Sequence, residues 1–302
     1  MTGRGTNAML AALLIAAAAL PQFAGDYFIG VGLSLLLYVA LTQSWVVLSG
    51  MTGYVSLGHV VFYGLGGYVA ALLWGEIPLA GIVVVAGLAA FALSILIGLP
   101  VLRVRGPYFV ILTFGVAELA KYMVIAVEGW LGKYSRIMMG APDLETLFYI
   151  MLALAAAATL LTLWVRQSRF GRGLLAIREN EEAAETIGVP TVRFKLLAFG
   201  LSALIPGMVG SVMVLRSTYF EPQQLFDPII SFSIVTMAVV GGSDDVRGPI
   251  LGAFGFLILS ELLWANAPQV YMILLGLLLI VFVLFMPDGL TGRLSFLKKR
   301  AR

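Results

Sequence analysis

Residues 27–75 read YFIGVGLSLLLYVALTQSWVVLSGMTGYVSLGHVVFYGLGGYVAALLWG, which is 49 positions without Asp, Glu, Lys or Arg. An α-helix rises 1.5 Å per residue, so about 20 apolar residues cross the hydrocarbon layer of a membrane. The stretch is therefore long enough for two crossings, and the segment from Gly50 to Gly58 divides it. It predicts a chain that is folded in lipid.

Similar uncharged runs occur elsewhere in the chain, at 5–25, 77–102, 146–165 and 196–215. Four further apolar spans are predicted at about 107–127, 228–241, 249–264 and 270–286. The runs lack the alternating pattern of a membrane β-barrel. The sequence therefore predicts an all-α polytopic membrane protein with about ten transmembrane helices.

The first run also has features of a secretory signal peptide, because Arg4 precedes an alanine-rich apolar core. The run is long, however, and no small-x-small cleavage site precedes the charged Asp26. A retained first span is the favoured interpretation, and a cleaved signal peptide is the alternative.

The composition supports a membrane protein and excludes several classes of site. Apolar residues make up 61% of the chain and charged residues 12%, whereas soluble domains carry roughly 25% charged residues. Cysteine is absent, which excludes disulfides, thiolate metal sites and a cysteine nucleophile. The net charge of +3 does not indicate nucleic-acid binding, because the charges lie in short segments between apolar runs.

The basic residues are distributed unevenly between the two sides. Threading ten spans with the N-terminus in the cytoplasm puts fifteen Lys and Arg residues on the cytoplasmic side and three on the other, with Lys121 inside a span. Because short basic loops stay in the cytoplasm, both termini are predicted to be cytoplasmic. The chain is then a single transmembrane domain over 1–302 with a basic cytoplasmic tail at 288–302.

One long polar segment interrupts this pattern at 167–195, reading QSRFGRGLLAIRENEEAAETIGVPTVRFK. Asn180 can cap a short helix, and the two glutamates after it favour the positive N-terminal end of that helix. Gly188 can end the helix in a left-handed conformation, and Pro190 prevents its continuation. The segment predicts a compact cytoplasmic helix, which is either a solvated connection or a docking surface for a soluble partner.

Glu182, Ala183 and Ala184, followed by Gly188, match the EAA-x-x-x-G signature of ABC importer permeases. The longer string SRFGRGLLAIRENEEAAETIGV resembles the coupling loop of the branched-chain amino acid permeases, the LivH/LivM family. Three other segments are similar to that family in the same order: GMTGYVSLGHVVFYGLGGYVAALL at 50–73, RVRGPYFVILTFGVAEL at 103–119 and VVGGSDDVRGPILGAF at 239–254. The RGPYF segment resembles the LivM-type subunit. The stretch EGWLGKYSRIMMGAPDLE lacks a glycine pair common in the family, which affects the choice of substrate more than the fold.

The resemblance implies a vitamin B12 importer-like, type II permease fold in the bacterial inner membrane. Such a permease domain forms half of a solute pathway and is not an enzyme. No P-loop sequence occurs, so ATP and Mg²⁺ would be bound by partners and this chain would need no cofactor. The implied partners are a homologous LivH-type permease, two ATP-binding cassette subunits and an extracytoplasmic solute-binding protein. The implied cargo is leucine, isoleucine or valine, with urea, short amides or other amino acids as alternatives.

Within this family, residues 167–195 correspond to the loop that receives the movement of the ATPase subunits. The residues that this resemblance assigns to ATPase coupling are Arg178, Glu181, Glu182, Ala183, Ala184 and Gly188.

The glycine-rich segment 50–67 supplies the first candidates for the solute pathway, namely Ser56, the single histidine His59 and Tyr63. A helix break here could turn a helix N-terminus toward a cavity and attract a carboxylate. The favoured alternative is a turn at the cytoplasmic boundary, followed by glycines that allow close helix packing. For His59 a packing role is favoured over a role in solute binding.

Charged residues inside the predicted spans are the other candidates. Glu118 and Lys121 lie three residues apart on one helix face, and each charge inside a bilayer costs on the order of 3 kcal/mol. A mutual salt bridge is the simpler interpretation. The alternative is that the two side chains line a polar route for a zwitterionic amino acid. Glu261 raises the same question. Asp244 and Asp245 are interpreted as solvated turn residues.

Three classes of function remain open on these residues. An ATP-driven importer subunit accounts for the polar segment. An ion-coupled secondary carrier would need a membrane-buried acidic site, for which Glu118 and Glu261 are candidates. An intramembrane enzyme would need a catalytic constellation at membrane depth, and the sequence contains no such pattern. The resemblance favours the importer.

Overall fold

The computed structural model describes residues 14, 16–132, 136–217, 219–266, 273, 276 and 277, and this part is almost entirely helical. The helices are α2 (Asp26–Trp45), which continues into the π-helix η1 (Val46–Gly50), α3 (His59–Leu73), α4 (Leu79–Val101), α5 (Pro107–Trp130), α6 (Leu144–Gln167), α7 (Arg169–Glu179), α8 (Glu181–Thr186), α9 (Thr191–Arg216), α10 (Pro222–Leu225), α11 (Pro228–Gly241) and α12 (Arg247–Asn266). Two short strands, β1 (Arg136–Ile137) and β2 (Tyr219–Phe220), pair antiparallel.

Among the described residues, six helical segments are long and apolar enough to cross a membrane, and each coincides with predicted apolar runs. They are Asp26–Gly50, Leu79–Val101, Pro107–Trp130, Leu144–Gln167, Thr191–Arg216 and Pro222–Gly241. The predicted third span is the shorter apolar helix α3, and α12 covers the predicted ninth span. The basic tail lies outside the described residues, as does the predicted tenth span except for residues 273, 276 and 277; of the first span, residues 14 and 16–25 are described and 16–23 are helical. The described part is thus that of a multi-pass helical membrane protein.

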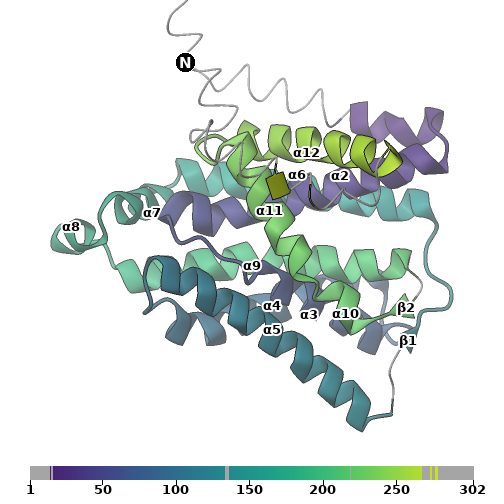
Figure 1. Ribbon diagram of the computed structural model, residues 1–302, viewed down its shortest axis with the longest axis horizontal. Helices are drawn as coiled ribbons and strands as arrows, with labels where there is room; N and C mark the ends of the chain where they lie inside the picture. The colour runs from purple at the N-terminus through teal and green to yellow at the C-terminus, as the bar shows by residue number, and fades with distance from the viewer. Residues whose placement is uncertain are drawn as a thin grey trace, which may run out of the picture.

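The elements are arranged along one long axis (Figure 1). Helices α7 and α8 project at one end, called here the α8 end, and the strands β1 and β2 lie at the opposite end, called the sheet end. Helix α9 packs against α2, α3, α4 and α6, and most of its residues are buried. The polar α7–α8 segment and the small sheet are therefore separated by the length of the helical bundle.

Glycines allow α3 and α9 to touch backbone to backbone. A Cβ atom added at Gly66 would collide with the carbonyl oxygen of Gly207, and one added at Gly210 would collide with the carbonyl oxygen of Tyr63. Small residues at helix interfaces in membranes permit this close approach. The predicted packing role of the glycines in 50–67 is confirmed at these positions.

The chain between η1 and α3 is non-helical from 53 to 58. Thr52 and Ser56 are buried, whereas Gly53 adopts φ +77° and is exposed. Because Trp45 Nε1 donates to the carbonyl of Ser56 at 2.8 Å, the loop folds back onto the helix that precedes it. The predicted helix break is therefore present, and residues 51–58 are called here the 51–58 loop.

The sheet end is fixed by a buried ion pair that was not predicted from the sequence. Glu128, near the end of α5, is 2% exposed and accepts two hydrogen bonds from Arg136, at 3.0 and 2.8 Å. The hydroxyl of Tyr68 in α3 donates to the same carboxylate at 2.9 Å. Because Arg136 begins β1, this ion pair joins the strand pair to α3 and α5.

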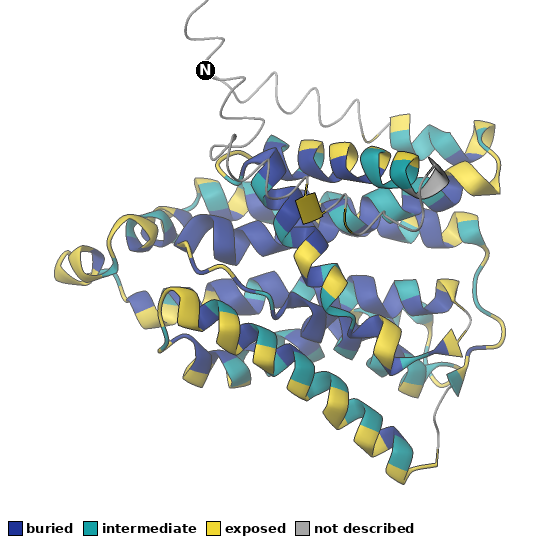
Figure 2. Cartoon of the chain, viewed as in Figure 1, coloured by how far each residue is buried: buried dark blue, intermediate teal, exposed yellow. Residues whose placement is uncertain are grey.

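Helix α5 is the least buried of the six long apolar segments. Large apolar side chains such as Ile111, Leu119 and Met123 are more than half exposed, and exposed positions recur along the whole helix in Figure 2. An exposed apolar helix is expected where lipid or another membrane protein covers it.

Candidate functional site

The polar segment folds as two consecutive capped helices. Ser168 accepts a hydrogen bond from Gly171 N at 3.0 Å and so caps α7, while Asn180 Oδ1 accepts one from Ala183 N at 3.0 Å and caps α8. Helix α8 ends where Gly188 adopts φ +86°. The predicted short helix after Asn180 is thus confirmed, with the cap and the glycine stop that were expected. Helix α7 was not predicted.

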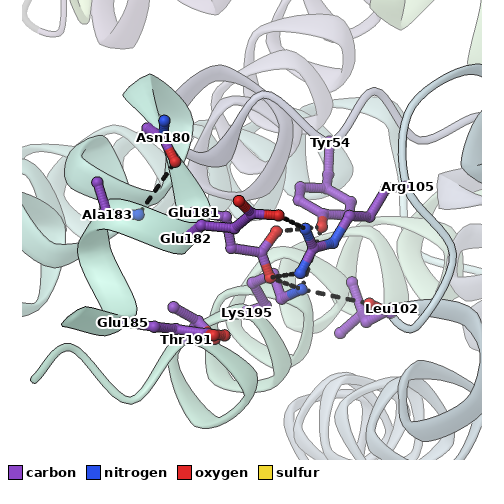
Figure 3. Close-up of polar contacts among 10 residues, drawn as sticks. All are labelled: Tyr54, Leu102, Arg105, Asn180, Glu181, Glu182, Ala183, Glu185, Thr191 and Lys195. Carbon is purple, nitrogen blue, oxygen red and sulfur yellow. Dashed lines mark hydrogen bonds and ion pairs between the residues drawn. The ribbon is translucent and has the colours of Figure 1, made fainter.

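The first residue of α8 is tied to the bundle by a network of polar contacts (Figure 3). Glu181 Oε1 lies 2.6 Å from Lys195 Nζ, and Glu181 Oε2 accepts a hydrogen bond from the Tyr54 hydroxyl at 2.6 Å. Lys195 also donates to Tyr54 Oη at 3.1 Å and to the carbonyl of Leu102 at 3.3 Å. The network therefore joins α8, the first turn of α9, the 51–58 loop and the end of α4.

The two charged side chains at the centre of this network are buried, so each depends on the other for charge compensation. The side chains of Lys195 and Glu181 are 4% and 10% exposed, so the loss of either partner would leave an uncompensated buried charge. Burial alone would raise the pKa of the Glu181 carboxyl, but the hydrogen bonds from Lys195 and Tyr54 and the nearby positive charges outweigh it and hold that pKa below its usual value. Burial, together with the hydrogen bond to Glu181, raises the pKa of the Tyr54 hydroxyl. Glu181 is therefore ionised and Tyr54 remains a donor at neutral pH.

The outer face of α8 is exposed at the tip of the α8 end. The side chain of Glu182 is 84% exposed, and its nearest cation is Arg105, at 3.7 Å. Ile187 directly follows α8 and is 77% exposed. By contrast, Ala184 is 2% exposed and faces the bundle. A large apolar side chain beside an exposed carboxylate, at the polar end of a membrane protein, is suited to protein contact.

Arg178, near the end of α7, makes a second connection to the bundle. Its Nη1 donates to the carbonyl oxygen of Gly50 at 2.9 Å and lies 2.8 Å from Asp244 Oδ1. Gly50 ends η1, and Asp244 lies in the connection between α11 and α12. π-Helix occurs mostly as single turns inside α-helices, and such turns are frequent at functional sites. Arg178 thus links the α7–α8 segment to the π-helix and to a connection far along the chain.

The structure brings some of the predicted coupling residues together and separates others. Arg178 and Glu181 bind the bundle, Ala184 packs inward, and Glu182 faces outward with Ala183 and Gly188. Three residues that contact the predicted coupling residues were not predicted as their partners. Tyr54 was considered only as part of the glycine-rich segment, and Lys195 and Arg105 only as basic residues. Asp244 and Asp245 are exposed, as predicted, and each also pairs with an arginine.

The predicted pathway residues Ser56 and His59 lie in or next to the 51–58 loop. Ser56 Oγ accepts from Gly58 N at 3.1 Å, which is a role in loop geometry. His59 is 1% exposed and packs edge-on against Phe62. Neither ring nitrogen of His59 has a hydrogen-bond partner among the residues that the structure describes. Its burial is in keeping with the favoured packing role, whereas the unpartnered nitrogens differ from the satisfied histidine that this role predicts.

Thr113 of α5 fixes the other side of this loop, because its hydroxyl accepts from Leu57 N at 3.1 Å. The next helix, α3, is tied at its start to α11, since Ser231 Oγ accepts from Val60 N at 3.2 Å. The 51–58 loop therefore contacts α5 on one side and the α8 network on the other.

Glu118 and Lys121 form the predicted salt bridge within α5. The distance from Lys121 Nζ to Glu118 Oε2 is 2.6 Å, and the two side chains are partly exposed. They pair with each other and, within the described part of the chain, not with Ser56, His59 or Tyr63. The five predicted pathway residues therefore do not form one cluster.

Comparison with known proteins agrees with this architecture. A family model described as "Branched-chain amino acid transport system / permease component" matches residues 27–283. Over 93% of its length the chain is 28% identical to the high-affinity branched-chain amino acid transport system permease protein LivM of Escherichia coli (strain K12), 74% of which is covered. It is 23% identical over 85% of its length to the LivH permease protein of Salmonella typhimurium, 91% of which is covered.

A shorter match, 31% identical, joins 41% of the chain to 39% of the L-arabinose transport system permease protein AraH of Escherichia coli (strain K12). No solved structure matches the chain. The family model covers most of the helical bundle, including the α7–α8 segment and the 51–58 loop. The chain therefore belongs to the family of permease components of branched-chain amino acid transport systems.

Proposed function

We propose that this chain is the LivM-type permease subunit of an ATP-driven importer of leucine, isoleucine and valine in a bacterial inner membrane. The match to LivM has the higher identity and extends over a larger share of this chain than the match to LivH, which supports the subunit type. In this proposal ten spans of a type II importer fold place both termini, and the α8 end, in the cytoplasm. A LivH-type permease, two ATPase subunits that bind ATP and Mg²⁺, and an extracytoplasmic binding protein complete the importer.

The observation that carries the proposal is the construction of α8. Its inner side is held by the buried Glu181–Lys195 ion pair, whereas Glu182 and Ile187 are exposed on its outer side. A rigidly held helix with an exposed mixed face can transmit a movement that a flexible loop would absorb. We infer that an ATPase subunit binds this face and that its movement passes through Glu181 and Arg178 to the 51–58 loop and η1.

The test is ATPase binding and uptake by variants of the outer face. Glu182→Arg and Gly188→Val should abolish ATPase association and leucine uptake while the chain still inserts in the membrane. Gly188→Val is strained because β-branched residues rarely adopt positive φ. Gly132→Val is its matched control, because Gly132 has φ +65° and open surroundings at the sheet end. Association at the unmodified level in both α8 variants would refute the docking proposal.

The cargo requires a separate measurement. Co-purification of the solute-binding protein and identification of its ligand would distinguish branched-chain amino acids from urea, short amides or other amino acids. Uptake that depends on an ion gradient and not on ATP would instead support a secondary carrier. Against that alternative, Glu118 is paired with Lys121, and Glu261 accepts a hydrogen bond from Tyr27 at 3.4 Å.

A further inference from the structure

A cavity of about 120 Å³ lies between α3, the final turn of α9 and α10. Its walls include Tyr63 of α3, Met213 and Val214 of α9, Leu225 of α10, and the polar side chains of Glu221 and Gln224. Because α9 ends toward β2 and the sheet end, the cavity is displaced from the α8 end by most of the length of α9 (Figure 1). The contacts described for the α7–α8 segment involve other residues.

The size of this cavity distinguishes it from a second one elsewhere in the bundle. One water molecule needs about 10–15 Å³ of such volume, so this cavity has room for roughly ten water-sized groups. A second cavity, lined by residues such as Phe62, Ile97 and Phe199, measures about 10 Å³. That space is apolar and holds at most one water. Only the larger of the two is wide enough for a small solute.

The polar wall of the larger cavity is suited to an ammonium group. Gln224 Nε2 donates to Glu221 Oε2 at 2.7 Å, which fixes the two side chains side by side. This hydrogen bond uses the amide's donor nitrogen and one carboxylate oxygen. Glu221 Oε1 and Gln224 Oε1 therefore remain acceptors, and one of them carries negative charge. Two adjacent acceptors with a net negative charge bind a protonated amine more strongly than a neutral amide.

The rest of the lining is suited to a hydrocarbon chain. Met213, Val214 and Leu225 supply apolar surface, and Met213 can adapt its flexible side chain to different branched shapes. Tyr63 is 5% exposed, and its backbone is clamped against Gly210, so it is a rigid part of the wall. An apolar pocket with a few placed polar groups is the usual form of a small-molecule site.

We propose that this cavity is a substrate subsite of the permease, in which Glu221 and Gln224 bind the ammonium group of an aliphatic amino acid and Met213, Val214 and Leu225 contact its side chain. The proposal rests on the proposed importer function, and it narrows the substrate class to solutes with both an ammonium group and a hydrocarbon chain. Under the proposed topology the subsite lies toward the outer side, where the binding protein delivers its solute.

The absence of cysteine from this chain allows a direct test of occupancy. A Met213→Cys variant, purified with its partner subunits, is labelled with a thiol reagent while leucine or isovaleramide, a neutral amide of similar shape, is titrated. Leucine should slow labelling of this chain in proportion to single-site occupancy, and isovaleramide should not. Adding Glu221→Gln should remove the protection by leucine. A Glu76→Cys reporter, exposed in the connection between α3 and α4, should react at the same rate with and without leucine.

Uptake by the reconstituted importer gives a second readout. Glu221→Gln, without any cysteine, should lower leucine uptake roughly tenfold or more, as expected for the loss of a charge-assisted hydrogen bond, whereas Glu76→Gln should retain uptake. If leucine fails to protect the thiol of Met213→Cys in a complex that imports leucine, the subsite is overturned while the proposed function stands. Unchanged uptake by Glu221→Gln has the same consequence. If the unmodified complex fails to import any amino acid with ATP, the proposed function is overturned, and the labelling assay still decides whether leucine occupies the cavity.

Discussion

Lys195 Nζ lies 2.6 Å from Glu181 Oε1, and both side chains are almost completely withdrawn from solvent. The pair joins the first turn of the long central helix α9 to the first residue of the short exposed helix α8. Since α9 packs against α2, α3, α4 and α6, a displacement of α8 at Glu181 acts on the centre of the bundle. This contact is the basis of the coupling route proposed above.

Replacing Lys195 by methionine should destabilise the protein because the carboxylate of Glu181 loses its buried partner. Breaking one side of a buried ion pair costs about 3–5 kcal/mol. The double variant Lys195→Met/Glu181→Gln removes both charges and should recover a large part of this loss. Thermal unfolding of the detergent-solubilised chain measures the effect, and Arg172→Met, an exposed position on α7, is the control. Equal stability of the single and double variants would mean that the pair is not coupled.

The docking of α8 should weaken in acid and not in mild base. The pKa of the Glu181 carboxyl is held below its usual 4.5, so the unfolded chain takes up this proton at higher pH than the folded chain does. The stabilisation is fully present above about pH 4.5 and is lost as the pH falls through the lowered pKa of the folded state. Hydrogen exchange of residues 181–187 as a function of pH measures this.

In Glu181→Gln the acid-dependent step should be smaller, because that carboxylate no longer titrates. Glu76→Gln, which removes an exposed carboxylate elsewhere, should keep the step. If exchange at 181–187 depends on pH equally in all three proteins, Glu181 does not control the docking of α8.

Replacing Arg178 by alanine should uncouple ATP hydrolysis from uptake. The same replacement should have little effect on the stability of the fold. The ion pair with Asp244 is partly exposed and contributes about 0–1 kcal/mol, but the hydrogen bond to Gly50 joins α7 directly to η1. We expect Arg178→Ala to keep ATPase association and to lower the number of solutes imported per ATP. Arg172→Ala on the same helix is the control. An unchanged ratio in Arg178→Ala would remove this residue from the coupling route.

Gly66→Ala should prevent correct folding, because its methyl group would collide with the backbone of Gly207, which cannot rotate away. Gly115→Ala is the matched control in another membrane helix, where a Cβ would meet nothing within 4 Å. There the substitution should be neutral, or stabilising by up to about 1 kcal/mol from helix propensity. Yield and unfolding temperature in detergent distinguish the two, and equal behaviour would contradict the α3–α9 packing.

The helical spans could be predicted from the sequence because lipid requires each backbone polar group to be satisfied inside its own helix. Long uncharged runs therefore report helices directly, and α11 was predicted with both of its observed ends. The cap at Asn180 and the stop at Gly188 were equally predictable, since both depend on local backbone geometry. In contrast, β1 and β2 are two residues each, and pairing of residues 136 and 220 has no local signal.

The partners in the candidate site were harder to predict for the same reason. Tyr54 and Glu181 are separated by 127 positions, and Arg178 and Asp244 by 66. Lys195 was visible as a charge at the start of a span, and a buried charge requires a partner, but the sequence offered several carboxylates. Tertiary packing decided among them. The larger cavity likewise arises from three segments that no motif connects, although Tyr63 had been a candidate on other grounds.

The central claim, that the outer face of α8 binds an ATPase subunit, is tested most directly by cross-linking from Ile187. Because the chain has no cysteine, Ile187→Cys can carry a single photoreactive label in the assembled complex, and Trp130→Cys at the exposed sheet end of α5 carries the same label as the control. We predict an ATP-sensitive cross-link between position 187 and an ATPase subunit, and none from position 130. Absence of that cross-link from position 187, in a complex that still imports its solute, would contradict the account.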